Sequence, residues 1–422
     1  MRPMPAPLGL YIHIPFCKSK CVYCDFYSLP RSESRMDDYT DALCAHLAET
    51  APFAAGHLVD TVYFGGGTPS YLGTKRLVKI LKTILKKYKV DKQAEITLEA
   101  NPDSAGDWKE LRTLRRCGFN RLSLGMQSAD DEELSEIGRV HTMAQTEAAV
   151  EAARKAKFQN LSLDLIYGLP HQTLEGWQKN LSAALDLTPE HLSCYGLKVE
   201  EGTPLFARRG TAGLPGDDAQ ADMYLYTVEF LKAQGYEQYE ISNFAKPGCA
   251  SRHNLKYWTL GEYAGFGPGA HSDFGGVRYA YTKDLEGYIR GVRDHAPMLS
   301  ESDRIPPLDR DTEWVMLGLH HGHPPLDLKH GRHRRRAHPA ADTPGGVHID
   351  CHALPPFPRA APAVPFYCNT PRRFLQVFSA AGGTFFPQTP SCIWETLCNL
   401  VDFVAPFPFT FPPVYAILKR IM

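Results

Sequence analysis

Three cysteines near the start of the chain have a spacing that suits metal binding. Cys17, Cys21 and Cys24 lie four and three residues apart, and no second cysteine pair follows at zinc-finger or zinc-ribbon spacing. A four-iron cluster held by three thiolates leaves one iron open, and an open iron can bind a small molecule. The cysteines therefore predict a [4Fe-4S] site. The alternatives are structural zinc, which needs a fourth ligand, and three cysteines that are simply buried in a core.

Polar and glycine residues follow several short apolar runs. The triplet Gly65-Gly66-Gly67 comes directly after the run 61–64, and we expect its backbone donors and acceptors to be free for a ligand. Three acidic or amide side chains stand at or near the ends of later runs: Glu99, Gln127 and Asp164. Taken singly, each could be a helix cap or a solvated residue. Their recurrence at neighbouring strand ends indicates one shared site.

These residues need a scaffold, and the sequence predicts an alternating one. Short apolar runs rich in β-forming residues occur at 8–13, 61–64, 95–99, 121–125, 161–168 and 191–199. Amphipathic helical patterns lie between them, as at 74–88 and 145–156. Six βα units predict an α/β fold with a parallel sheet, as a partial (β/α)6 TIM-like barrel. In such barrels chemistry gathers at the carboxyl ends of the strands.

The chain divides into three regions. We expect residues 1–235 to form the barrel, ending with a helix over 217–234, and residues 236–319 to form an α+β extension. This extension has a Gly- and aromatic-rich part, 236–272, and two expected helices at 284–293 and 309–319. Residues 320–422 differ sharply in composition, because they hold 16 of the 33 prolines but only 5 of the 47 acidic residues. They show no sustained helical or strand period.

Two interpretations of residues 320–422 remain. The favoured one is an altered reading frame, because the segment combines many prolines with many aromatic residues, a poor composition for a packed core. The other is a natural disordered tail with a His-rich patch that binds metal, although natural disorder is usually depleted in aromatic residues. Sequencing the gene around codons 317–322 distinguishes them.

Composition narrows the class of protein. The 46 basic and 47 acidic residues give no electrostatic reason to expect a nucleic-acid or membrane partner. The N-terminal stretch is broken by Pro and His, so we expect neither a signal peptide nor a transmembrane segment. Eleven cysteines without paired spacing argue against a disulfide framework. We therefore expect a cytoplasmic protein.

The cysteine spacing, together with Tyr23 before the third cysteine and Thr68-Pro69 after the glycines, resembles the radical S-adenosylmethionine superfamily. That resemblance implies a [4Fe-4S] cluster on the three cysteines and S-adenosyl-L-methionine on its open iron. The positions that match the cofactor-binding positions of the superfamily are Tyr11, Tyr23, Gly66, Gly67, Thr68, Glu99, Gln127, Arg139 and Asp164. Glu99 and Asp164 suit ribose hydroxyls or the methionyl ammonium, and Arg139 suits the carboxylate.

Further motifs, at 167–173, 239–245 and 265–272, resemble the HemN/HemW branch of the superfamily. This branch contains oxygen-independent coproporphyrinogen III oxidases and haem chaperones. The oxidases carry a fourth cysteine two positions after the third, where this chain has Phe26. The segment 252–258 matches the His-Asn-x-x-Tyr-Trp haem motif of the chaperones. The resemblance therefore favours a haem chaperone.

The chaperone interpretation implies a haem site at His253, Tyr257 and Trp258, since imidazole can ligate haem iron and flat aromatic rings can cover a porphyrin. The other possibility is that His253 is an ordinary hydrogen-bonded histidine among core aromatics. The implied partners are haem and haem-accepting proteins such as respiratory enzymes, with a possible homodimer. Two further functions stay open: oxidative decarboxylation of coproporphyrinogen III, and an inactive remnant in which the tail replaces the C-terminal helical domain of the family. Whether the protein is an enzyme is not decided by the sequence.

Overall fold

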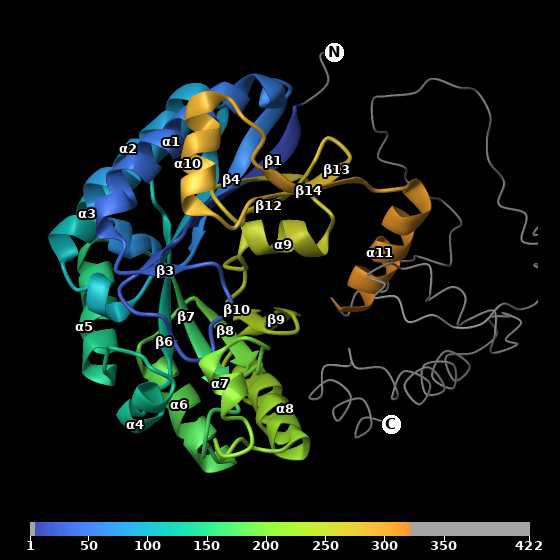
Figure 1. Cartoon of the computed structure of the whole chain (residues 1–422). Helices are drawn as coiled ribbons and strands as arrows, with labels where there is room; N and C mark the ends of the chain where they lie inside the picture. The colour runs from blue at the N-terminus through green and yellow to red at the C-terminus, as the bar shows by residue number, and fades with distance from the viewer. Residues whose placement is uncertain (1–4, 321–422) are drawn as a thin grey trace, which may run out of the picture.

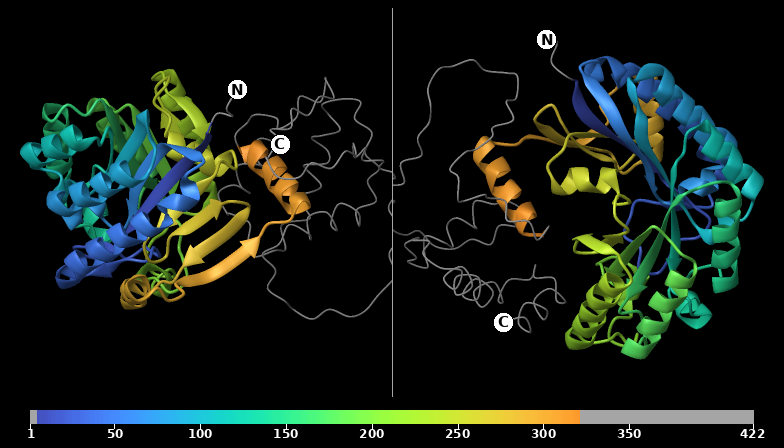
Figure 2. Two further views of the ribbon diagram at one scale, coloured as in Figure 1. Left: turned by 90° about the horizontal axis from the view of Figure 1, so that it is seen from above. Right: turned by 180° about the vertical axis from the view of Figure 1, so that it is seen from behind.

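The computed structural model describes residues 5–320 of the chain (Figure 1). Both interpretations of the C-terminal segment concern residues that lie outside this described part. The described residues form a strongly curved sheet with helices along its outer face (Figure 2). This is the α/β, barrel-like architecture that the sequence predicts.

Six parallel strands form the centre of the sheet, and each overlaps one of the predicted apolar runs. In spatial order they are β1 (Ala6–Ile14), β4 (His57–Gly66), β5 (Val90–Ala100), β6 (Arg121–Gln127), β7 (Asn160–Tyr167) and β8 (His191–Gly196). The last two strands end one and three residues before the ends of the runs predicted at 161–168 and 191–199. Every neighbouring pair in this series is parallel. Their carboxyl ends therefore meet at one rim of the barrel, as expected for this topology.

The helices that connect these strands cover the outside of the sheet (Figure 1). The larger ones are α1 (Met36–Thr50), α2 (Thr74–Lys87), α3 (Trp108–Cys117), α5 (Met143–Lys155), α6 (Leu174–Asp186) and α8 (Asp217–Ala233). Short helices stand in the loops: α4 (Asp131–Glu136), α7 (Pro204–Ala207), and the 3-10 turns η1 (Glu33–Arg35), η2 (Ala51–Ala54), η3 (Pro69–Leu72) and η4 (Pro102–Ser104). The outward-facing strand residues and the inner faces of the helices make one large buried apolar core.

Residues 236–319, expected to form an extension, add strands to both edges of the same sheet. The hairpin β9 (Glu237–Glu240) and β10 (Asn243–Ala245) joins the β8 edge. At the other edge β11 (Tyr263–Phe266) runs parallel to β1. It is followed outward by β12 (His271–Phe274), β13 (Val277–Tyr281) and β14 (Leu299–Arg304), and the helices of this region are α9 (Arg252–Trp258), α10 (Leu285–Asp294) and α11 (Pro307–His320).

The sheet does not close within the described residues. Its order has β14 at one end and β9 at the other, so the barrel stays open between them. Helix α9 lies on the inner side of this opening (Figure 2). No helix among residues 5–320 is long and apolar enough to cross a membrane.

Candidate functional site

The cysteine loop begins on a short strand at the rim of the barrel. Cys17 ends β2 (Phe16–Cys17), which pairs with β3 (Leu29–Pro30), and the loop between these strands carries Cys21 and Cys24. Burial raises the pKa of the Cys17 and Cys24 thiols, and the neighbouring Cys21 thiol adds to both shifts. Among the described residues, no three His, Cys, Asp or Glu side chains are gathered closely enough to hold a metal ion. The three thiols are therefore neighbours on one loop, without converging on a single point.

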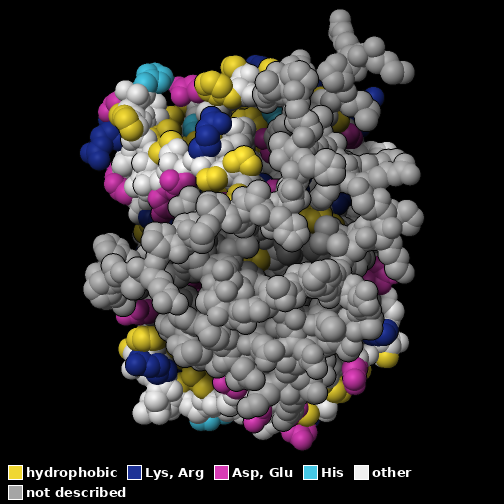
Figure 3. Space-filling model, turned by 90° about the vertical axis from the view of Figure 1, so that its right-hand side faces the viewer, with side chains coloured by type: hydrophobic (Ala, Val, Ile, Leu, Met, Phe, Trp, Pro, Cys, Tyr) yellow, Lys and Arg dark blue, Asp and Glu magenta, His cyan; other side chains and the backbone are white. Residues whose placement is uncertain are grey.

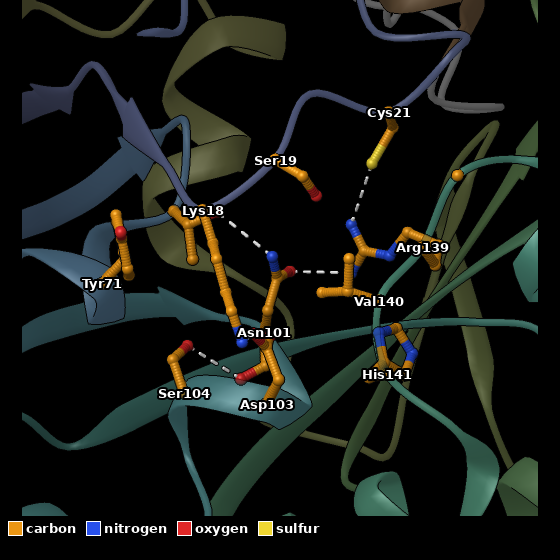
Figure 4. A pocket seen from close by; sticks show the side chains of 12 residues that line it. Lys18, Ser19, Cys21, Tyr71, Asn101, Asp103, Ser104, Arg139, Val140 and His141 are labelled. Atoms are coloured by element: carbon orange, nitrogen blue, oxygen red, sulfur yellow. Dashed lines mark hydrogen bonds and ion pairs between the residues drawn. The ribbon is translucent and has the colours of Figure 1, made fainter. Parts of the chain in front are cut away.

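A chain of hydrogen bonds connects two of these cysteines through side chains from three loops. Figure 4 shows the part of it that runs from Asn101 through Arg139 to Cys21. Thr68 Oγ1 donates to Cys17 Sγ at 3.5 Å, and Asn101 Nδ2 donates to Thr68 Oγ1 at 3.1 Å. Arg139 then donates to Asn101 Oδ1 at 2.7 Å through Nη2 and to Cys21 Sγ at 3.5 Å through Nη1. The rim residues that follow β4, β5 and β6 thus hold both sides of the cysteine loop.

The glycine triplet lies against the cysteine loop, and its amides are already bonded. Gly66 N donates to Glu99 Oε2 at 3.2 Å, Gly67 N to Ile14 O at 2.8 Å, and Thr68 N to the carbonyl of Phe16 at 2.8 Å. The prediction that these donors are free is therefore wrong. The physical reason is that β1 and β4 are parallel neighbours, so the end of β4 continues along the chain leading to Cys17.

Glycine is needed in this triplet because the backbones approach closely. A Cβ atom on Gly67 would lie 2.8 Å from Phe16 O and 3.0 Å from Cys17 Sγ. At Gly66, where φ is +110°, it would lie 2.6 Å from the His13 ring. The glycines thus position the cysteine loop against the strand ends.

Two partly buried carboxylates face the inside of the barrel. Glu99 accepts a hydrogen bond from the Tyr63 hydroxyl at 2.7 Å, and burial raises its pKa to about 7, with a further contribution from the charge of Asp164. Asp164 accepts from Ser123 Oγ at 3.1 Å and from Ser162 Oγ at 3.3 Å, and burial raises its pKa as well. The structure thus places Glu99 and Asp164, both predicted from their positions at or near strand ends, close enough to interact electrostatically.

Gln127 and Tyr11 occupy the same rim. Gln127 ends β6 with φ of 64°, a left-handed conformation that is uncommon for residues other than glycine. Its amide nitrogen would be 2.9 Å from a Cβ on Gly125, so it lies over that strand end beside Arg139. Tyr11 on β1 shares a hydrogen bond of 3.1 Å with His13 Nδ1 and stacks on Tyr63 at 6.3 Å.

Tyr23 lies on the cysteine loop, between Cys21 and Cys24. It packs against a small apolar cluster that is separate from the main core. Burial raises the pKa of its hydroxyl, while the nearby Arg139 acts to lower it. The backbone of the preceding residue is fixed on both its donor and its acceptor, since Val22 N donates to Ile137 O at 3.2 Å and Leu205 N donates to Val22 O at 3.0 Å.

His253 stands on α9, inside the barrel, and is 1% exposed. Its Nδ1 is 2.8 Å from Thr61 Oγ1 and its Nε2 is 2.9 Å from the Tyr257 hydroxyl. The ring also stacks on Tyr63 at a centroid distance of 5.2 Å. Burial lowers the pKa of His253 to about 3, so the imidazole is neutral at physiological pH. Both ring nitrogens have hydrogen-bond partners in this arrangement. Iron could bind to a ring nitrogen only if the Thr61 or the Tyr257 hydroxyl moved away from it.

The aromatic residues beside His253 are less deeply buried. Tyr257 and Trp258 are partly exposed at the end of α9, and Tyr257 makes an edge contact with Tyr263 at 4.7 Å. They provide an apolar surface directly next to His253. His271 is exposed on β12.

Comparison with known proteins identifies the family. A family model described as the radical SAM superfamily matches residues 11–183. The haem chaperone HemW of Bacillus subtilis is 38% identical over 312 residues, covering 73% of this chain and 82% of that protein. HemW of Escherichia coli is 40% identical over 291 residues, covering 68% and 76% respectively. The chain belongs to the HemW family of radical S-adenosylmethionine proteins. Membership of this superfamily implies a [4Fe-4S] cluster and S-adenosylmethionine.

A solved structure supports the fold of this HemW-family chain. Coproporphyrinogen III oxidase (HemN) from Escherichia coli, described as a radical SAM enzyme, superimposes with a TM-score of 0.68 at 29% identity. The match covers 76% of this chain and 77% of that one. The resemblance to the HemN/HemW branch and the barrel fold are thus confirmed.

Two residues of the site were not found from the sequence. Asn101 directly follows the strand that carries Glu99, and only the structure shows that it joins Thr68 to Arg139. His141 follows Arg139 by two residues and is 3% exposed. Its Nε2 lies 3.1 Å from Met126 O, while its Nδ1 has no hydrogen-bond partner among the described residues. The position of Asn101 directly after β5 was the available signal, whereas His141 gave none.

Arg139 and His141 face a small cavity beside the cysteine loop (Figure 4). Within the described part of the chain, the buried Arg139 Nε is also without a hydrogen-bond partner. Because His141 Nε2 donates to a carbonyl and burial lowers the pKa of the ring to about 4, its Nδ1 is an unprotonated acceptor. Two residues that line the cavity therefore carry one unused donor and one unused acceptor. It is lined by Lys18, Ser19, Cys21, Thr68, Tyr71, Asn101, Asp103, Ser104, Gly138, Arg139, Val140 and His141.

Proposed function

We propose that this chain is a haem chaperone, which holds a [4Fe-4S] cluster and S-adenosylmethionine, binds haem and delivers it to haem-requiring proteins. The observation that carries the cofactor part is the hydrogen-bonded chain from Cys17 through Thr68, Asn101 and Arg139 to Cys21. A merely structural group of cysteines has no need for donors directed at its sulfur atoms. The chaperone part rests on the HemW relatives and on the segment around His253.

The residues of the loop fit an iron–sulfur cluster. Cys17, Cys21 and Cys24 are all free thiols, and the donors Thr68 and Arg139 suit sulfur atoms that carry negative charge. A cluster bound here supplies one open iron and one electron. The loop must draw its three thiols together around the cluster, because they do not converge on a point in the described structure.

The cavity residues fit the amino-acid end of S-adenosylmethionine. Arg139 Nε is an unused donor that suits a carboxylate, and His141 Nδ1 is an unused acceptor that suits an ammonium group. An α-amino acid carries both groups on one carbon. We assign the ribose hydroxyls to the partly buried carboxylates Glu99 and Asp164, with Tyr11, Tyr23, Gly66, Gly67 and Gln127 as the remaining contacts of the cofactor.

We place haem at the end of α9. Tyr257 and Trp258 offer apolar area, and the neutral imidazole of His253 is the form that ligates iron. Binding through Nε2 requires the hydroxyl of Tyr257 to turn away from it. We also propose a cytoplasmic location, because all seven cysteines of residues 5–320 are free thiols, and we retain a homodimer as a possible assembly.

The second candidate function is oxidation of coproporphyrinogen III, and the observation that favours it is the structural match to HemN. One residue argues against the oxidase function. Phe26 replaces the fourth cysteine that the resemblance assigns to the oxidases, and this side chain is 64% exposed. The third candidate, an inactive remnant, predicts that the chain does not retain iron after anaerobic reconstitution.

A transfer assay separates these functions. Haem-loaded, reconstituted protein is mixed with a haem-free haemoprotein, and the absorption band of the acceptor is followed. The chaperone gives acceptor-bound haem and forms no protoporphyrinogen from coproporphyrinogen III. Formation of protoporphyrinogen with consumption of S-adenosylmethionine would instead establish the oxidase, and a protein without iron or haem would establish the remnant.

A further inference from the structure

Helix α2 is the most one-sided charged element among the described residues. It carries six basic residues and no acidic residue within Thr74–Lys87. The rest of this region has the opposite balance, since residues 1–319 without α2 hold 36 minus 6, or 30, basic residues and 42 acidic residues. On the face shown in Figure 3, basic side chains lie among acidic ones. A helix whose charged residues are all basic, within a region that is otherwise acidic, is therefore a local feature.

An open groove follows the exposed side of this helix. It is shallow and open to solvent, with a volume of about 530 Å3, so it suits side chains lying along the helix rather than one enclosed ion. We call it the α2 groove, and it is lined by Thr74, Lys75, Val78, Lys79, Lys82, Thr83 and Lys86 of α2 and by Thr113 of α3.

Most of the cations at the α2 groove have no acidic partner. Lys79 pairs with Asp41 of α1, but Lys75, Lys82 and Lys86 form no ion pair with any residue among 5–320. All four lysines are exposed. The neighbouring helix α3 adds four more basic residues and one acidic residue, Glu110. The positive charge is thus available to a partner from outside.

The spacing of the lysines matches an extended peptide. Lys75, Lys79, Lys82 and Lys86 lie on one helix face, and at about 1.5 Å per residue they span about 16 Å. Alternate side chains of an extended strand lie about 7 Å apart, close to the axial distance of about 6 Å between Lys75 and Lys79. About five extended residues would cover the row.

We propose that the α2 groove docks an acidic segment of a partner protein, with Asp or Glu at alternate positions. A carboxylate already lies at one end of the groove, where Thr74 donates to Glu110 at 3.1 Å. A membrane surface fits less well, because Leu85 is the single large apolar side chain exposed on α2 and α3 within the described residues. This surface is independent of the cluster and haem sites.

The test uses the full chain and a fluorescent peptide of five Ser-Glu repeats, with a Ser-Gln repeat as the neutral peptide. The charge-reversed variant is Lys75→Glu/Lys82→Glu/Lys86→Glu. The matched control is Lys232→Glu/Arg290→Glu/Arg304→Glu, whose three residues are exposed, lack ion pairs within the described part and lie outside the groove. Both variants change the net charge equally and keep the basic C-terminal segment unchanged.

We expect the acidic peptide to bind, the neutral peptide not to bind, and the groove variant to weaken the affinity at least tenfold. The control variant should change it less than twofold, and raising salt from 50 to 300 mM should weaken binding. Equal weakening by both variants would overturn the proposal. So would tighter binding, at equal charge concentration, to phosphatidylglycerol vesicles or to a single-stranded oligonucleotide, since the surface would then be a membrane or nucleic-acid site.

Discussion

At the scale of single residues, Asn101 is the side chain on which the cysteine loop depends. Asn101→Ala removes the acceptor of Arg139 and the donor to Thr68, and both partners are largely buried. We expect the free energy of unfolding to fall by about 1 to 3 kcal/mol, because buried polar groups lose their partners. The electron paramagnetic resonance spectrum of the reduced cluster should also change, because the donors to Cys17 and Cys21 lose their fixed orientation.

A matched control separates this effect from simple destabilisation. Asn120 also makes two hydrogen bonds, to Ile96 N at 2.8 Å and Ala94 O at 2.7 Å, but it lies at the start of β6, away from the cysteines. Asn120→Ala should destabilise the protein and leave the cluster spectrum unchanged. The positioning role of Asn101 is wrong if both variants give the wild-type spectrum.

The raised pKa of Glu99 predicts that the stability of the folded protein depends on pH. Its pKa rises from 4.5 to about 7 in the folded protein because of burial, so folding favours the protonated form. The stabilisation of the folded protein by the protonated Glu99 carboxyl is therefore fully present below pH 4.5 and is lost as the pH rises through 7. Between pH 5.5 and 7.5, the wild type should lose about 2 kcal/mol of unfolding free energy relative to Glu99→Gln. Urea unfolding at the two pH values measures this, and parallel curves for both proteins would contradict it.

Tyr257 tests how haem reaches His253. If iron binds to Nε2, it must displace the Tyr257 hydroxyl, which is 2.9 Å away. Tyr257→Phe keeps the ring and removes the competing hydrogen bond, which is worth about 1 kcal/mol, so haem affinity should rise about fivefold. Titration of the porphyrin absorption band measures the affinity. Weaker binding by Tyr257→Phe would mean that the hydroxyl itself contacts haem.

The sequence could name many of these residues but not their partners. Glu99 and Asp164 were predicted because they stand at strand ends, and the parallel order of β5, β6 and β7 brings them together. The hydrogen bonding of the amides in this loop was not predictable from the triplet alone. The acceptors of Gly67 N and Thr68 N belong to residues near Cys17, some 50 positions away, and the acceptor of Gly66 N is Glu99. His141 gave no signal at all, since an unpartnered nitrogen is visible only in three dimensions.

At the scale of elements, a cluster of ion pairs holds α11 to the edge of the sheet. Arg310 donates to both carboxylate oxygens of Asp273, at 2.6 and 2.7 Å, and Arg278 donates to both oxygens of Glu313, at 2.9 and 3.0 Å. Arg278 also contacts Asp273 at 3.1 Å. Burial acts to raise the pKa of Asp273, but Arg310 and Arg278 outweigh it and lower the pKa.

Asp273→Ala should therefore release α11. Two arginines lose their shared partner, and we expect hydrogen exchange of the first turns of α11 to become at least tenfold faster, with a loss of about 2 kcal/mol in unfolding free energy. Arg293→Ala is the control, because its pair with Asp294 is exposed and contributes little. Unchanged exchange in α11 would show that the ion pairs do not hold it.

An element was predictable from the sequence when its apolar residues follow a regular period over many positions. The strands β1 and β7 and the helix α2 have sustained patterns, and the sequence predicts all three. Strand β11 is short and rich in glycine and aromatic residues, and its parallel pairing with β1 joins positions about 250 residues apart. Local periodicity contains no information on such a pairing.

At the scale of the whole molecule, the open sheet explains how one chain can serve two ligands. The cysteine loop and the carboxylates occupy the rim of the parallel strands, while α9 with His253 lies inside the barrel beside them. Tyr63 contacts both parts, since its hydroxyl donates to Glu99 and its ring stacks on His253. The proposed cofactor and haem sites therefore share one wall, β4.

The most direct test of the central claim is a haem titration of the anaerobically reconstituted protein, followed by the porphyrin absorption band. His253→Ala is compared with His46→Ala, which removes an equally buried histidine bonded to Tyr288 and Tyr281 and far from α9. We predict saturable binding by the wild type, at least tenfold weaker binding by His253→Ala, and little change for His46→Ala. Absence of saturable binding by the wild type, or equal affinity of His253→Ala and wild type, would contradict the haem chaperone with its site on α9.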